Sequence, residues 1–204
     1  MVVTTRAAGR GPCRRAPLAA VLAATLAAAT GCTSAAAGPA DADGPPSAGP
    51  QAVVIAAQER RDAPELSGAD LRGGRAGLAP LRGRVVVLNV WGSWCGPCWT
   101  EAAGLEAVHR ETEGQGVRFL GINTRDRDRE AARAFEERYE LTYPSLHDPR
   151  GDLLLRFPEG TLNPQAVPST LLLDRRGRVA ASIAGPVTPA ELRPLIARLA
   201  GEPE

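Results

Sequence analysis

The feature that most constrains the fold is a pair of cysteines directly behind a β-branched and apolar run. Residues 85–90 form that run, which is typical of a strand covered on both faces. Trp94-Cys95-Gly96-Pro97-Cys98 follows, and the segment after it is expected to be helical to about residue 113. A cysteine where a strand passes into a helix lies at the positive end of the helix dipole. Its thiol is therefore expected to be acidic and reactive.

The remainder of the chain alternates strands and helices. Residues 117–122 are expected to form a second buried strand, residues 129–139 a helix, and residues 168–173 and 178–184 two strands paired through a turn. Thr188-Pro189-Ala190-Glu191 is a capping-box signature for a last helix, in which Pro194 should cause a bend. This order predicts an α/β fold with a central mixed sheet flanked by helices.

Composition excludes several classes of function. The chain has a formal net charge of +1, and all of its basic residues are arginine. Without lysine, Schiff-base chemistry and a lysine-based phosphate loop are excluded. The arginines alternate with acidic residues, as in residues 125–130, so no basic patch indicates nucleic-acid binding.

The first 31 residues are expected to direct export, and residues 32–52 are expected to tether the domain to the membrane. Four arginines precede an apolar stretch at residues 18–29, which is shorter than the ~20 residues that span a bilayer. Ala29-Thr30-Gly31-Cys32 resembles the lipobox of bacterial lipoproteins, although ordinary cleavage near residues 35–37 is an alternative. The prediction is a signal peptide at 1–31, a lipidated Cys32 with a disordered tether to residue 52, and one domain at 53–204.

Three kinds of chemistry are open to the dithiol of Cys95 and Cys98. A structural zinc site needs two further ligands, for which the mature chain offers only His109 and His147. An inert structural disulfide is the second reading. In the third, thiol exchange, Cys95 attacks a partner's disulfide and the less exposed Cys98 resolves the mixed disulfide. Gly96 would then let a partner chain come close, and Pro97 would fix φ inside the redox loop.

The segment from Asn89 to Cys98 resembles the active site of thioredoxin-fold proteins, specifically the TlpA-type extracytoplasmic group that includes cytochrome c maturation reductases. Tyr143-Pro144-Ser145-Leu146 and Val167-Pro168-Ser169-Thr170 extend the resemblance, which covers roughly residues 66–199. It implies the thioredoxin fold with an inserted helix and strand at residues 123–146.

The resemblance also implies roles for single residues. Pro168 matches a cis-proline that faces the dithiol, and Val167 before it would offer backbone to the partner. Glu101 matches a carboxylate kept near the dithiol, where it would manage protons for Cys98; the alternative is a first-turn acid that complements the helix dipole. Asn89 stands where cytosolic thioredoxins hold a buried aspartate, which moves proton transfer toward Glu101.

Two tryptophans and two histidines complete the candidates. Trp94 is either a packing residue or a lip of the partner groove, whereas Trp91 is expected to pack in the core. His109 and His147 are expected to be surface or packing residues.

The sequence therefore predicts an exported thiol:disulfide oxidoreductase, lipid-anchored to the outer face of the cell membrane, that reduces protein disulfides without a metal or organic cofactor. The family implies apocytochrome c or its maturation factors as partners and a membrane protein as electron donor. A disulfide oxidase or isomerase is the alternative direction. Peroxide reduction is disfavoured because peroxiredoxins place a lone cysteine in a different motif. A Cu(I)-binding lipoprotein or adaptor is the alternative outside enzymes.

Overall fold

The computed structural model describes residues 52–203. Three predicted features lie outside the described residues: the signal peptide, the lipidated Cys32 and the tether up to residue 51.

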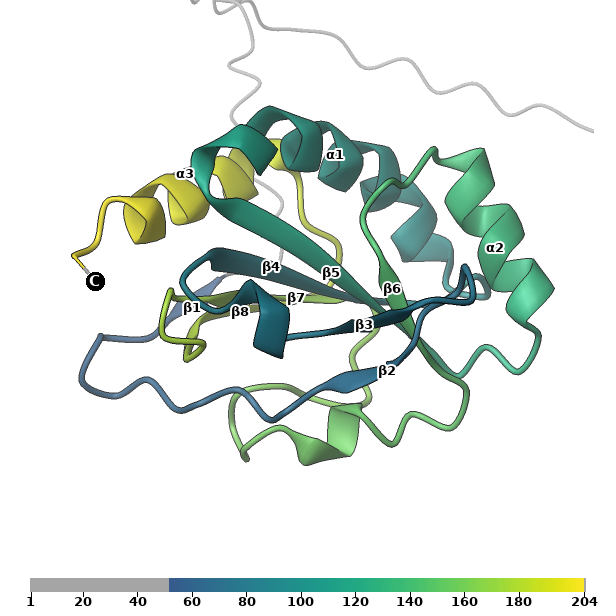
Figure 1. Ribbon diagram of the computed structural model, residues 1–204, viewed down its shortest axis with the longest axis horizontal. Coiled ribbons are helices and arrows are strands. Elements are labelled where there is room, and N and C mark those ends of the chain that lie inside the picture. The colour runs from purple at the N-terminus through teal and green to yellow at the C-terminus, as the bar shows by residue number, and fades with distance from the viewer. Residues whose placement is uncertain (1–51, 204) are drawn as a thin grey trace, which may run out of the picture. The chain divides into compact units, whose positions relative to one another are not determined.

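Within residues 52–203, six strands form one mixed sheet in the order β1-β8-β7-β4-β5-β6, and β2 and β3 form a separate hairpin (Figure 1). The strands are β1 (Val53–Val54), β2 (Ser67–Ala69), β3 (Arg75–Gly77), β4 (Val85–Trp91), β5 (Val117–Thr124), β6 (Ser145–Asp148), β7 (Ser169–Leu173) and β8 (Val179–Ala184). The α-helices are α1 (Gly96–Thr112), α2 (Arg129–Arg138) and α3 (Pro189–Ala200), and the short 3-10 helices are η1 (Ala79–Leu81), η2 (Glu113–Gln115) and η3 (Leu154–Arg156).

The strand register brings three loops to one edge of the sheet. β4, β5 and β6 are parallel, with Trp91 opposite Asn123 and Thr124 opposite Asp148. β7 is antiparallel to β4 and starts beside its carboxyl end, where Ser169 pairs with Val90. The segment after β4, the segment after β5 and the segment before β7 therefore meet at this edge, which holds the candidate site.

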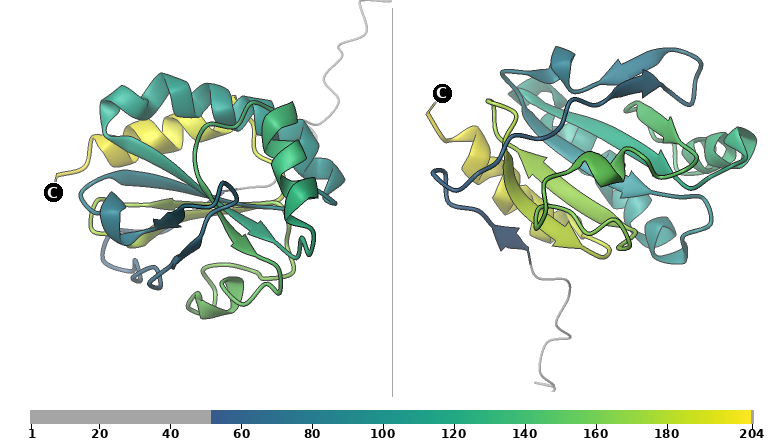
Figure 2. Two further views of the ribbon diagram at one scale, coloured as in Figure 1. Left: turned by 45° about the vertical axis from the view of Figure 1, so that its right-hand side comes forward. Right: turned by 90° about the horizontal axis from the view of Figure 1, so that it is seen from below.

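Both faces of the sheet are covered, as the apolar run of β4 predicted. α1 and α3 lie side by side on one face, and α2 packs on the same face through Phe135, which stacks on Trp91 (Figure 1). The other face is covered by the β2–β3 hairpin and the segment around η3 instead of an α-helix, as both views of Figure 2 show. All seven residues of β4 are buried, because they alternate between these two cores.

The helix ends follow local signals in the sequence. Thr188 caps α3 in the predicted capping box, since its side chain accepts from Glu191 N–H while Glu191 accepts from Thr188 N–H. α3 continues through Pro194 to Ala200. Asp128 caps α2 by accepting from Glu130 N–H. None of the helices in the described range is long and apolar enough to cross a membrane.

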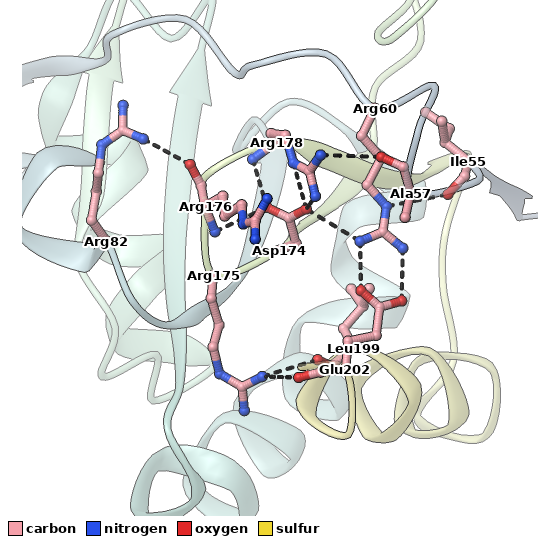
Figure 3. Close-up of polar contacts among 10 residues, drawn as sticks. All are labelled: Ile55, Ala57, Arg60, Arg82, Asp174, Arg175, Arg176, Arg178, Leu199 and Glu202. Carbon is pink, nitrogen blue, oxygen red and sulfur yellow. Dashed lines mark hydrogen bonds and ion pairs between the residues drawn. The ribbon is translucent and has the colours of Figure 1, made fainter. Parts of the chain in front are cut away.

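A buried arginine holds the ends of the domain together at the edge opposite the candidate site. Arg60, whose side chain is 1% exposed, binds Asp174 at 3.2 Å and both carboxylate oxygens of Glu202 at 2.6 and 2.7 Å (Figure 3). Asp174 also binds Arg178 at 2.7 Å. Because Leu173 pairs with Val86 at the amino end of β4, this cluster lies at the far end of that strand from the cysteines.

Replacing Arg60 with alanine is expected to lower the free energy of unfolding by about 3 kcal/mol, because the change removes one member of a buried, hydrogen-bonded ion cluster. Arg82→Ala is the matched control. Arg82 is exposed and donates to the carbonyl of Arg176 at 2.8 Å, so its loss should cost less than about 1 kcal/mol. Urea unfolding of the two variants checks this, and equal losses would contradict the role assigned to Arg60.

Candidate active site

The two cysteines of the motif form a disulfide at the start of α1. Their sulfurs lie 2.12 Å apart and their Cα atoms 5.3 Å apart. Cys95 is the N-cap of α1, and its Sγ accepts a hydrogen bond from the backbone N–H of Cys98 at 3.2 Å. The same N–H also donates to the Cys95 carbonyl at 3.1 Å, so this N–H at the start of the helix is shared between the carbonyl and the sulfur. In the reduced protein such a donor favours the thiolate form of Cys95.

The two cysteines differ in position more than in exposure. Cys95 is 3% exposed and Cys98 1%, so Cys98 is the less exposed cysteine only by a small margin and both are buried. The reason is that Cys95 turns inward to bond Cys98 and packs in the core beneath α1. Gly96 and Pro97 between them are exposed, which leaves this segment open to a partner chain.

Glu101 lies in the second turn of α1 and is buried, with 3% of its surface exposed. Its Oε1 accepts from the side-chain amide of Asn89 at 2.9 Å, and its Oε2 accepts from the backbone N–H of Val187 at 2.9 Å. Asn89 also donates to the hydroxyl of Thr170 at 3.2 Å, so β4 and β7 together fix the carboxyl group. The first turn of α1 holds no acidic residue, so the alternative reading of Glu101 as a first-turn acid is wrong.

Burial raises the pKa of Glu101 from 4.5 to about 7, against the opposing effect of the hydrogen bonds from Val187 and Asn89. Glu101 and Cys98 line the same narrow internal gap, which is too small to hold a water molecule. Residues three apart in a helix lie on one face, which places the carboxyl group on the side of Cys98. The arrangement suits a group that exchanges a proton near neutral pH.

The peptide bond between Val167 and Pro168 is cis, as predicted. Pro168 is buried, and its carbonyl accepts from the N–H of Gly185 at 2.8 Å. Val167 is half-buried and packs against both cores of the domain. This turn directly precedes β7, so it reaches the same edge of the sheet as the cysteines.

Trp94 is partly packed and partly exposed. Its indole N–H donates to the carbonyl of Thr124 at 3.1 Å, and the Arg125 guanidinium lies 5.4 Å from the ring centroid. The ring nevertheless remains 49% exposed beside Cys95. Gly92 permits this position, because a Cβ there would lie 2.5 Å from the indole nitrogen.

Asp126 and Trp99 also lie at the site, although neither was predicted from the sequence. Asp126 accepts from the backbone N–H and the hydroxyl of Ser93, both at 2.7 Å, and thereby fixes the loop before the cysteines. Trp99 follows Cys98, is 51% exposed, and donates from its indole to the carbonyl of Ser93 at 3.0 Å. An aromatic residue next to the motif was the available signal for Trp99, whereas Asp126 is brought to the site only by the pairing of β4 with β5.

The histidines and Trp91 have packing roles. His109 is buried between Phe119 and Tyr143, and His147 donates from Nε2 to the Asp126 carbonyl at 2.9 Å. Trp91 is buried and bonds Ser145. No group of three or more His, Cys, Asp or Glu residues in the range 52–203 is placed to hold a metal ion.

Comparison with known proteins agrees with this geometry. Residues 60–182 match the model of the AhpC/TSA family. The thiol-disulfide oxidoreductase ResA of Geobacillus thermodenitrificans is 32% identical over 131 residues, which span 64% of this chain and 72% of the relative.

Two solved structures have the same fold. A DsbF homologue from Corynebacterium diphtheriae is 33% identical with a TM-score of 0.69, covering 75% of this chain and 96% of that one. A secreted thiol-disulfide isomerase from Corynebacterium glutamicum is 30% identical with a TM-score of 0.70, covering 76% and 95%. The fold is thus the thioredoxin fold that the motif predicted. Since the family match covers more than half of the 204 residues, the chain belongs to the AhpC/TSA family and is a thioredoxin-like thiol-disulfide oxidoreductase.

Proposed function

We propose that this protein is an extracytoplasmic reductase of protein disulfides, anchored to the outer face of the cell membrane by lipid on Cys32. The observation that carries the redox function is the Cys95–Cys98 disulfide at the N-terminus of α1, beside the buried carboxyl group of Glu101. No metal or organic cofactor is needed, because the dithiol itself supplies the two electrons.

The proposed reaction has two exchange steps. The Cys95 thiolate attacks one sulfur of the partner's disulfide, so that a mixed disulfide forms and the partner's other sulfur leaves as a thiolate. Cys98 then gives its proton to Glu101 and attacks Cys95 Sγ. The Cys95–Cys98 bond forms, and the second partner sulfur leaves as a thiolate. The partner gains two electrons, and the protein is left oxidised.

The direction of electron flow depends on the reduction potential. Gly96-Pro97 is the dipeptide of reducing thioredoxins, which supports reduction, while one structural relative is described as a secreted isomerase. Equilibration with dithiothreitol redox buffers measures the potential. A value near −270 mV, as in thioredoxin, is expected, and one near −120 mV, as in DsbA, would favour the oxidase alternative.

The export and the anchor rest on the N-terminal sequence and on relatives such as the secreted protein from Corynebacterium glutamicum. Labelling cells with a radioactive fatty acid is expected to mark the wild-type chain and to leave Cys32→Ser unmarked. Label on both chains, or on neither, would contradict lipidation at Cys32.

A membrane protein that passes electrons from cytoplasmic thioredoxin is the proposed donor, and apocytochrome c or its maturation factors are the proposed substrates.

Reduction of insulin by dithiothreitol tests the enzymatic proposal. The wild-type chain should accelerate insulin precipitation, and Cys95→Ser should not, because it lacks the attacking thiol. Titration of the reduced protein with Cu(I) addresses the alternative of a copper-binding adaptor. Tight copper binding without any insulin reduction would overturn the proposed function.

A further inference from the structure

The two largest exposed apolar side chains of the described domain flank the dithiol. Within residues 52–203 the exposed large hydrophobic residues are Val53, Val54, Trp94, Trp99 and Leu155. Trp94 directly precedes Cys95, and Trp99 directly follows Cys98. Exposed aromatic surface is unfavourable in water and commonly marks a binding surface. Trp94 already contacts the Thr124 carbonyl and the Arg125 guanidinium. The exposure of the Trp99 ring therefore calls for a separate reason.

Trp99 forms one wall of an apolar groove against α2. The hollow has a volume of about 370 Å³. We call it the Trp99 groove, and it is lined by Trp99, Ala131, Ala134, Phe135, Arg138 and Tyr139, with Ser93 at one end. The two alanines leave space that a larger side chain would fill. The aromatic rings supply apolar contact area for a single large side chain.

The Trp99 groove is linked through Ser93 to the segment that carries Cys95. Ser93 lies in its lining, stands two residues before Cys95, and accepts from the Trp99 indole through its carbonyl. Asp126 holds Ser93 through two hydrogen bonds, so the junction is fixed. A polypeptide bonded to Cys95 therefore has its neighbouring residues within reach of the groove.

The positive charge of Arg138 favours one kind of polypeptide in the Trp99 groove. Arg138 is the charged residue of the lining, and its guanidinium lies 5.8 Å from the Tyr139 ring centroid. It makes no ion pair within 4.0 Å in the range 52–203. A carboxylate beside the bound apolar group would complement this charge, whereas a basic residue would be repelled.

From these contacts we propose that the Trp99 groove binds a large apolar side chain, with an acidic neighbour, of the polypeptide whose disulfide reacts with Cys95. This inference rests on the proposed function and adds a sequence preference to it. The groove selects substrates, and it takes no part in the electron transfer itself.

The test uses disulfide-linked peptide dimers that contain one cysteine per chain and one phenylalanine moved position by position along either side of it. At one spacing, the wild-type protein is expected to reduce the phenylalanine peptide with a kcat/KM about tenfold above that of its alanine counterpart. An adjacent glutamate should increase this preference, and an adjacent arginine should decrease it. Equal rates at every spacing would overturn the proposal.

Two variants locate the preference in the groove. Trp99→Ala removes a wall, and Ala134→Glu fills the hollow and pairs with Arg138 one turn later in α2. Both should abolish the preference for phenylalanine. Ala197→Glu, an exposed change on α3, is the matched control and should retain the preference.

The outcomes separate this inference from the proposed function. If the wild-type protein reduces none of the peptides and no insulin, the proposed function fails. If it reduces them with a preference that both groove variants retain, the groove assignment alone fails. Circular dichroism of each variant shows whether it is folded, and because the two changes differ in kind, either folded variant is sufficient for the comparison.

Discussion

Cys98→Ser is expected to hold the partner protein on Cys95 as a stable mixed disulfide and to end turnover. Cys98 lies inside the first turn of α1, where it can reach Cys95 Sγ, whereas Cys95 is the N-cap of the helix and directly precedes the exposed residues Gly96 and Pro97. Serine has nearly the same size, yet its hydroxyl cannot displace a thiolate from a disulfide. Purification of the variant from cells under non-reducing conditions, followed by mass spectrometry, should identify the conjugated protein and the attached cysteine.

Cys95→Ser is the matched control for this trap. If Cys95 attacks first, the control should yield no conjugates, because the remaining thiol of Cys98 lies within the helix and lacks the N-cap position that favours a thiolate. Recovery of the same conjugates from Cys95→Ser would contradict the order of attack. Adding dithiothreitol to the Cys98→Ser conjugate should release the partner, as expected for a disulfide.

Glu101→Gln is expected to slow the second exchange step about a hundredfold above pH 7 and much less below it. The ionised carboxylate accepts the proton of Cys98, and burial places the pKa of Glu101 at about 7, so the acceptor is largely lost in more acidic solution. Glutamine retains the shape of the side chain and cannot accept the proton. Stopped-flow measurement of the release of a peptide from Cys95 across pH gives the ratio of wild-type to variant rates.

The same substitution should change how stability depends on pH. Because the pKa of Glu101 is higher in the folded protein than its usual 4.5, its contribution is fully present below pH 4.5 and is lost as the pH rises through about 7. The loss amounts to about 3 kcal/mol for a pKa increase of this size. Relative to the wild type, oxidised Glu101→Gln should therefore gain stability in urea unfolding between acidic and alkaline pH.

Glu111→Gln provides the control for both measurements, because Glu111 is an exposed carboxylate on the same helix, paired with Arg193 at the surface. It should leave the rate ratio and the pH dependence of stability unchanged. A Glu101→Gln protein whose second step follows the wild-type pH profile would argue against proton transfer through Glu101.

The elements with strong hydrophobic patterns could be predicted from the sequence. The buried strand at residues 85–90, the helix behind the cysteines and the capping box at Thr188 all carry local signals, and each lies within a residue or two of its predicted bounds. The β2–β3 hairpin was missed because its short strands, Ser67–Ala69 and Arg75–Gly77, lack an alternating apolar pattern. A side-chain turn at Asp70, which accepts from Arg72 N–H and Gly74 N–H, closes it instead.

The residues of the site could be predicted only where they belong to a short sequence motif. Cys95, Cys98 and the cis bond before Pro168 could be placed from sequence, since each lies in a recognisable short segment. The burial of Cys95 and the contacts of Asp126 arise from the packing of α1 and from strand pairing over long separations. The groove beside Trp99 likewise requires α2 to lie next to the start of α1, and no local pattern specifies that arrangement.

All three tryptophans of the chain, Trp91, Trp94 and Trp99, lie within four residues of a cysteine of the disulfide. An excited indole loses its energy efficiently to a nearby disulfide bond but much less to a pair of thiols. Intrinsic fluorescence should therefore rise when the protein is reduced, with no background from tryptophans elsewhere. The arrangement gives the protein a built-in optical reporter, so that its redox state can be followed in real time without a chemical label.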